Sequence, residues 1–133
     1  MGTSPLKAIL DTSVLIATDV PRLDGDLAIS SASLAELHFG VLVTTDAAVR
    51  AERLRRLSDF QRRFDALPVD DEVAVSYGQL AAAVAATGRR PRPRPRVMDL
   101  LIAATAHAHS ARLYTRNEAD LTGIEELVDI VPI

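Results

Sequence analysis

Residues 8–16, AILDTSVLI, decide the predicted fold. Three apolar residues lead to Asp11, and the polar pair Thr12 and Ser13 then opens a second apolar run. This pattern predicts a short buried strand that turns directly into a helix. An acid at such a junction lies at the carboxyl end of a strand, and this is the edge at which open α/β sheets hold their functional groups.

The rest of the chain continues the alternation of short strands and helices. Strands are expected at 27–29, 112–115 and 127–131, with a strand or connector at 66–69; helices are expected from Ser33, over 46–64, from 73 to near Gly88 and over 97–108, with a turn or short helix at 117–120. Strands that alternate with helices predict a parallel sheet covered by helices on both faces. The length of 133 residues predicts one domain, 1–133.

Composition excludes several classes of protein. Apolar residues make up 48% of the chain and charged residues 25%, which is typical of a soluble globular protein. The absence of cysteine excludes disulfides, thiolate metal sites and a cysteine nucleophile. No signal peptide or long apolar run is found, so we expect a cytoplasmic protein. The net charge of −3 argues against a generic polyanion binder.

Four acids lie where an apolar segment meets a helix start or a turn: Asp11, Glu36, Asp99 and Asp120. If the fold brings them together, two carboxylates about 4 Å apart repel by roughly 4 kcal/mol at an effective dielectric of 20, so a cluster needs a cation. Oxygen ligands favour Mg²⁺ or Mn²⁺ over zinc. The three histidines are not expected to be ligands.

Helix capping is an alternative explanation for each acid. Asp11 could cap the helix that follows it, Glu36 could complete a capping box with Ser33, and Asp99 could interact with a helix dipole. Asn117 and Asp120 could form a similar cap. Capping does not explain why Asp99 starts an almost wholly apolar helix, where a carboxylate is costly unless it is paired or metal-bound. The four acids together therefore favour a metal site.

Five segments resemble the PIN-domain ribonucleases, in particular the VapC-type toxins of toxin–antitoxin modules: LDTSVLI, SLAEL, DLLIAATA, TRNEADL and GIEELVDIVPI. The resemblance covers nearly the whole chain. It implies a three-layer α/β/α sandwich and a Mg²⁺- or Mn²⁺-dependent endoribonuclease that cuts RNA. It also implies a cognate antitoxin protein as partner and suggests a homodimer, without any membrane association.

The resemblance also assigns roles to residues. Asp11 and Asp99 match the main metal ligands, and Glu36 matches the third catalytic acid. Many relatives have an acid where this chain has Asn117, so either the site uses three acids or Asp120 contributes, for example through a metal-bound water. Thr12, Ser13, Thr115 and Asn117 are the expected supports of the carboxylates, although turn capping explains the hydroxyls equally well.

Two arginine-rich segments have several interpretations. The run at 89–96 alternates with three prolines, which predicts an extended conformation. Its residues Arg92, Arg94 and Arg96 could contact RNA phosphates or an acidic antitoxin segment, or form a solvated linker. The arginines of the 46–64 helix are mixed with acids, which favours a salt-bridged surface. The apolar side of that helix could add to an antitoxin groove or a dimer contact.

Two other classes of protein were compared with the ribonuclease hypothesis. A receiver domain needs a lysine late in the chain, and the only lysine is Lys7. A non-catalytic PIN-like module that binds RNA or protein through a weakened acidic site agrees better with the sequence, because Asn117 replaces an acid. This alternative stays open at the level of sequence.

Overall fold

The computed structural model describes residues 6–88 and 96–133, and its centre is a parallel five-stranded sheet. The strands are β1 (Lys7–Leu10), β2 (Asp26–Ser30), β3 (Asp65–Leu67), β4 (Arg112–Thr115) and β5 (Ile130–Pro132), in the order β3-β2-β1-β4-β5. The central strand β1 pairs Ile9 with Ala28 of β2 and with Leu113 of β4. All four pairings are parallel, so the predicted parallel sheet is confirmed.

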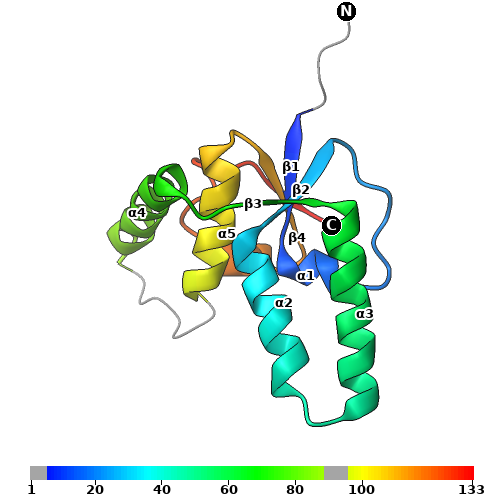
Figure 1. Cartoon of the computed structure of the whole chain (residues 1–133). Coiled ribbons are helices and arrows are strands. Elements are labelled where there is room, and N and C mark those ends of the chain that lie inside the picture. Colours follow the sequence, from blue (N-terminus) through cyan, green and yellow to red (C-terminus); the bar gives the residue numbers. More distant parts are fainter. Residues whose placement is uncertain (1–5, 89–95) are drawn as a thin grey trace, which may run out of the picture.

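Helices cover both faces of the sheet. They are α1 (Thr12–Leu15), α2 (Ser31–Val43), α3 (Ala47–Arg63), α4 (Asp71–Ala86), α5 (Arg96–Ala108) and the 3₁₀ helix η1 (Glu118–Leu121). Figure 1 shows α4 and α5 on one side of the sheet and α1 and α3 on the other, with α2 and α3 forming an antiparallel hairpin that extends past the sheet. In the described part of the chain, no helix is long and apolar enough to span a bilayer.

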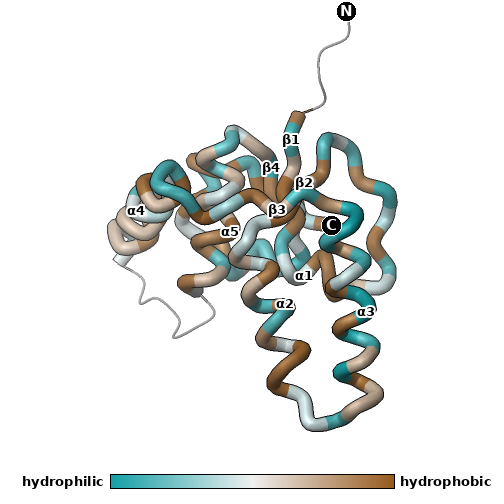
Figure 2. Tube along the Cα trace, in the orientation of Figure 1, coloured by the Kyte–Doolittle hydropathy of each residue, from teal (hydrophilic) through white to brown (hydrophobic). Residues whose placement is uncertain are grey.

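The alternation of side chains along β1 builds one core on each face. Ile9 packs with α4 and α5 residues such as Leu80 and Ile102, all three fully buried. Leu10 packs on the opposite face with Val14 of α1 and with α3. Burying one such side chain stabilises the fold by about 1.5–3 kcal/mol. The tube in Figure 2 is brown along parts of the central strands, whereas much of α3 is teal.

The structure corrects two boundaries. Helix α2 begins at Ser31, not Ser33, because Ser30 is its N-cap and the Ser30 hydroxyl accepts from the backbone N–H of Ala32 at 3.1 Å. The predicted capping box of Ser33 and Glu36 is therefore wrong. Strand β5 begins at Ile130 instead of 127, since a turn precedes it in which Val128 donates to the carbonyl of Ile124.

Gly25 holds the turn that leads into β2. Its φ is +112°, and a Cβ there would lie 2.8 Å from the Leu6 carbonyl oxygen. We expect Gly25→Ala to lower the free energy of unfolding by about 1–3 kcal/mol, because the substitution combines a positive φ with a backbone clash. Urea denaturation measures this change.

Gly78 provides the matched control for that substitution. It lies within α4, where a Cβ meets nothing within 4 Å. Gly78→Ala should raise stability by about 0.5–1 kcal/mol, since alanine favours a helix interior. Equal effects of the two substitutions would contradict the role assigned to the Gly25 turn.

Candidate active site

Asp11 is the best-anchored acid of the candidate site. It follows β1 directly, is the N-cap of α1, and has only 6% of its surface exposed. Its Oδ1 accepts from the Thr12 backbone N–H at 2.8 Å, and its Oδ2 accepts from the hydroxyls of Ser13 at 3.0 Å and Thr115 at 2.7 Å. A carboxylate has about four acceptor positions. Three are used by these bonds, so the capping interpretation of Asp11 holds and Oδ1 can still accept one further ligand.

The turn after β4 is interlocked with the start of α1. The Thr115 hydroxyl accepts from the backbone N–H of Asn117 at 3.0 Å, and the Ser13 hydroxyl accepts from the backbone N–H of Arg116 at 3.0 Å. Each hydroxyl thus donates to Asp11 and accepts from this turn. The carboxylate orientation is therefore fixed by two segments about a hundred residues apart in the chain.

Glu36 lies in the second turn of α2 and points at α1. The Thr12 hydroxyl donates to Glu36 Oε1 at 2.8 Å and lies 3.2 Å from the Ser33 hydroxyl. Burial raises the pKa of Glu36, the bond from Thr12 opposes that rise, and the charge of Asp11 adds to it. Thr12 links the two acids, because its backbone N–H donates to Asp11 and its hydroxyl donates to Glu36.

Asp99 approaches the same edge of the sheet from the other side. It lies in the first turn of α5 and is partly exposed, and Figure 1 shows the N-terminal end of α5 on the side of the sheet where β1 ends. The Ser30 and Thr105 hydroxyls, 2.9 Å apart, join the start of α2 to the middle of α5. Asp99 lies six residues before Thr105, about 9 Å along the helix axis.

The turn at η1 holds Asn117 and Asp120, the two residues between which the sequence left the fourth position of the candidate site open. Asn117 occupies the N-cap position of η1, but its side chain makes no capping hydrogen bond, so the predicted side-chain cap is wrong there. Asp120 is half-buried in η1, and its backbone N–H donates to the Asn117 carbonyl at 3.0 Å. An exposed amide and a half-buried acid thus lie on the same short turn.

The donor set agrees with a magnesium site of few protein ligands. Among residues 6–88 and 96–133, no three Asp, Glu or His side chains come close enough together to hold an ion. Magnesium commonly uses only one or two carboxylates, with waters and substrate phosphates as its remaining ligands. A buried carboxylate with one acceptor position left therefore fits this ion. Histidine offers no zinc set here, since His38 is exposed and His107 pairs with Ser76 at 2.8 Å.

Two groups near the acids were not predicted to belong to the site. Ser33 was interpreted as a helix cap, yet its hydroxyl lies beside Thr12. Arg53 and Arg56 were assigned to a solvent-facing surface, yet both line a cavity together with Glu36. Among the arginines predicted to bind RNA, Arg92 and Arg94 lie outside the described residues, as does the side chain of Arg96.

Comparison with known proteins identifies the family. The family model described as PIN domain matches residues 8–125. The chain belongs to the PIN-domain family. Its relatives in that family include ribonuclease VapC5 of Mycobacterium tuberculosis H37Rv, which is 38% identical over 124 residues, covering 89% of this chain and 88% of the relative. Ribonuclease VapC8 of the same organism is 37% identical over 102 residues, covering 74% of this chain and 88% of the relative.

Solved structures agree with this PIN-domain assignment. The crystal structure of VapBC-5, a member of the VapBC family of toxin–antitoxin systems from M. tuberculosis, matches with a TM-score of 0.81 at 34% identity, covering 97% of this chain and 98% of that chain. FitAcB from Neisseria gonorrhoeae matches with a TM-score of 0.74 at 25% identity, covering 92% and 95%. The predicted PIN-like α/β/α fold is thereby confirmed.

Replacing Glu36 tests whether its ionised carboxylate lowers the stability of this PIN domain. Because burial and Asp11 raise the pKa of Glu36, its ionised form is disfavoured in the folded state. Glu36→Gln keeps an acceptor for Thr12 and removes the charge. In EDTA at neutral pH we expect the variant to be more stable by less than about 1 kcal/mol, a value discounted for partial exposure.

The pH dependence of the stability difference between Glu36→Gln and the parent protein is the control for that experiment. Stability conferred by a carboxyl with a raised pKa is lost as pH rises through that pKa, so the advantage of Glu36→Gln should shrink as pH falls below the ordinary pKa of glutamate. Denaturant titrations at neutral and acidic pH measure both differences. A variant less stable than the parent at neutral pH would argue against a cost of ionising Glu36 through burial and the charge of Asp11.

Proposed function

We propose that this chain is the toxin of a type II toxin–antitoxin module and acts as a metal-dependent endoribonuclease that hydrolyses RNA phosphodiester bonds. The observation that carries the proposal is the buried Asp11 carboxylate, fixed by three hydrogen bonds beside Glu36, in a chain matched over 89% of its length by a ribonuclease. The catalytic acids of this proposal are Asp11, Glu36 and Asp99, with Asp120 as a contributor. We further propose that residues 1–133 act as one domain.

Asp11 and Asp99 are the proposed ligands of Mg²⁺ or Mn²⁺. When bound, such an ion lowers the pKa of a water molecule and offsets negative charge on the phosphate. The side chains of the protein position the two carboxylates. Ser13 and Thr115 hold Asp11 in one orientation, and Thr12 holds one oxygen of Glu36, so both carboxylates present fixed oxygens to the substrate side.

The proposed protein partners are a cognate antitoxin and a second copy of this chain. The similar crystal structure of VapBC-5 belongs to a family of toxin–antitoxin systems, which supports the first partner. Helix α2 supports contact with protein in general, because Phe39, Leu42 and Val43 expose more than half of their surface near the end of the hairpin. Large exposed apolar side chains that lie together commonly mark interaction sites. The cytoplasm, where RNA and antitoxin occur, is the proposed location.

Loss of either proposed metal ligand should abolish cleavage. We expect Asp11→Asn and Asp99→Asn to reduce Mn²⁺-dependent cleavage of structured RNA more than about a hundredfold, because the site loses a charged ligand. Asp71→Asn is the control, since Asp71 occupies the first turn of α4 as Asp99 does in α5. Undiminished activity in either site variant would remove that residue from the site.

Thermal stability distinguishes a catalytic site from a non-catalytic PIN-like module. An intact ion site raises Tm with Mn²⁺ by mass action. We expect this rise in the parent protein and in Asp71→Asn, and its loss in Asp99→Asn. A protein that shows neither the rise nor cleavage would support the alternative of a binding module with a weakened acidic site, which Asn117 keeps open.

Two substitutions test whether the side chains of Asp120 and Asn117 affect the proposed metal site. If Asp120 contributes through a metal-bound water, Asp120→Asn should lower cleavage about tenfold to a hundredfold, the usual loss for an indirect ligand contact. Asn117→Asp adds a carboxylate at the N-cap of η1 and should tighten Mn²⁺ binding in a Tm titration. An Asp120→Asn variant with parental kcat and KM would leave a site of three acids.

A further inference from the structure

The six arginines of α3 divide into two groups by the charge of their partners. Arg55 pairs with Glu52, and Arg62 and Arg63 pair with Asp59 at 3.7 and 3.4 Å. All of these side chains are well exposed, so the predicted salt-bridged surface is confirmed for these three arginines. Their positive charges are largely neutralised by the neighbouring acids.

The hydrogen bonds of the other three arginines go to backbone carbonyls, and the guanidinium of Arg56 also lies over the Phe60 ring. Arg50 donates to Thr44 O at 2.6 Å, Arg53 to Gly40 O at 2.7 Å, and Arg56 to Leu15 O at 2.9 Å. In the described part of the chain, no carboxylate forms an ion pair with any of them. Their spacing of three residues places them along one side of α3, the side toward α2 and α1. We call Arg50, Arg53 and Arg56 the arginine row.

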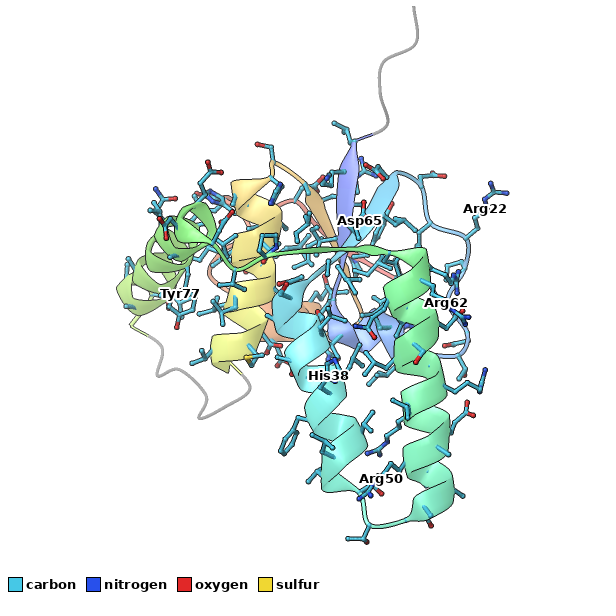
Figure 3. The ribbon with its side chains drawn as sticks, in the orientation of Figure 1. Arg22, His38, Arg50, Arg62, Asp65 and Tyr77 are labelled. Atoms are coloured by element: carbon cyan, nitrogen blue, oxygen red, sulfur yellow. The ribbon has the colours of Figure 1, made fainter. Side chains whose placement is uncertain are left out.

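The arginine row begins at the candidate active site. A cavity of about 410 Å³ lies between α1, α2 and α3, and its lining includes Arg53 and Arg56 together with Thr12 and Glu36. From Arg56 to Arg50 the row covers about 9 Å along the helix axis. Figure 3 shows Arg50 near the far end of the hairpin, between α2 and α3. The row thus leads from Glu36 outward along the hairpin.

We propose that the arginine row binds backbone phosphates of the RNA strand next to the bond that is cut. This inference depends on the proposed ribonuclease function, and it names a binding site for that substrate. A guanidinium has five N–H donors. Arg53 uses one of them for Gly40 O, so it can bind a phosphate without breaking an ion pair.

Charge and position favour RNA over an acidic protein segment as the ligand. Glu36 and the acids near it would repel the phosphates of a substrate that enters the site. The row supplies three positive charges on the same cavity or beside it, and phosphate contacts of this kind fix the register of a strand without reading its bases. A row positioned for this purpose must adjoin the cleavage site, as Arg53 and Arg56 do through the cavity they share with Glu36.

RNA binding without cleavage tests the proposal. In the Asp99→Asn background with EDTA, we measure the affinity for a short single-stranded RNA of mixed sequence by fluorescence anisotropy over a series of salt concentrations. Arg53→Gln should weaken binding roughly three- to tenfold at low salt. It should also reduce the slope of log affinity against log salt by about 0.7, the value for one lost phosphate contact on a single strand.

Two matched variants separate charge from structure. Arg53→Lys retains the charge and should retain the salt slope, which a purely structural role at Gly40 O would not predict. Arg55→Gln removes an arginine two residues away that is paired with Glu52, and it should leave affinity and slope unchanged. In the cleavage-competent protein, Arg53→Gln should raise KM while kcat stays near the parental value, as expected for a residue that binds substrate remote from the reacting atoms.

The outcomes distinguish this inference from the proposed function. If the parent protein cleaves RNA but Arg53→Gln keeps the parental affinity, salt slope and KM, the proposal that the arginine row binds RNA is overturned. The proposed nuclease function then stands. If Arg53→Gln weakens binding of the cognate antitoxin but not of RNA, the row is an acidic-protein site and the proposal is also overturned. A parent protein that does not cleave RNA with Mn²⁺ contradicts the proposed function itself.

Discussion

The burial of the Asp11 carboxylate is the constraint on which the rest of the site depends. A charge with 6% exposure is costly unless donors replace the lost water. The donors come from Thr12 and Ser13 of α1 and from Thr115 at the end of β4. Because β1 and β4 are neighbours in a parallel sheet, they end at the same edge, and this pairing brings Thr115 next to Asp11. The hydrogen bonds that hold Asp11 therefore depend on the order of the strands in the sheet.

The same hydrogen bonds hold Asp11 and Glu36 on either side of Thr12. Asp11 cannot move away from Glu36, since three hydrogen bonds fix it, and Thr12 holds Glu36 from the other side. Burial is the main cause that raises the pKa of Glu36, the hydrogen bond from Thr12 opposes the rise, and the charge of Asp11 adds to it. A cation or a nearby positive side chain relieves such strain. Arg53 and Arg56 line the cavity that contains Glu36, so the site has both signs of charge available within a small volume.

Much of the fold could be predicted from the sequence because its signals are local. The run before Asp11 and the helical spacing around Leu57 and Phe60 identified β1 and α3 without knowledge of any contact. The start of α2 could not be predicted in this way, since the S-x-x-E pattern at Ser33 looks like a capping box while the true cap is Ser30. Ser33 and Glu36 contact Thr12, more than twenty residues away, and local patterns do not contain that information.

Asn117 shows how the site can be balanced with one charge fewer. At this position the chain has an uncharged amide, so the side chain adds no repulsion to the acids of the candidate site. The backbone of Asn117 still donates to Thr115, and the support of Asp11 is kept whatever the side chain. The substitution therefore separates two functions of the turn: its backbone positions Asp11, whereas its side chain sets the charge offered to an ion. An amide brings no negative charge to an ion, and the half-buried Asp120 on the same turn is the acid proposed to contribute in its place.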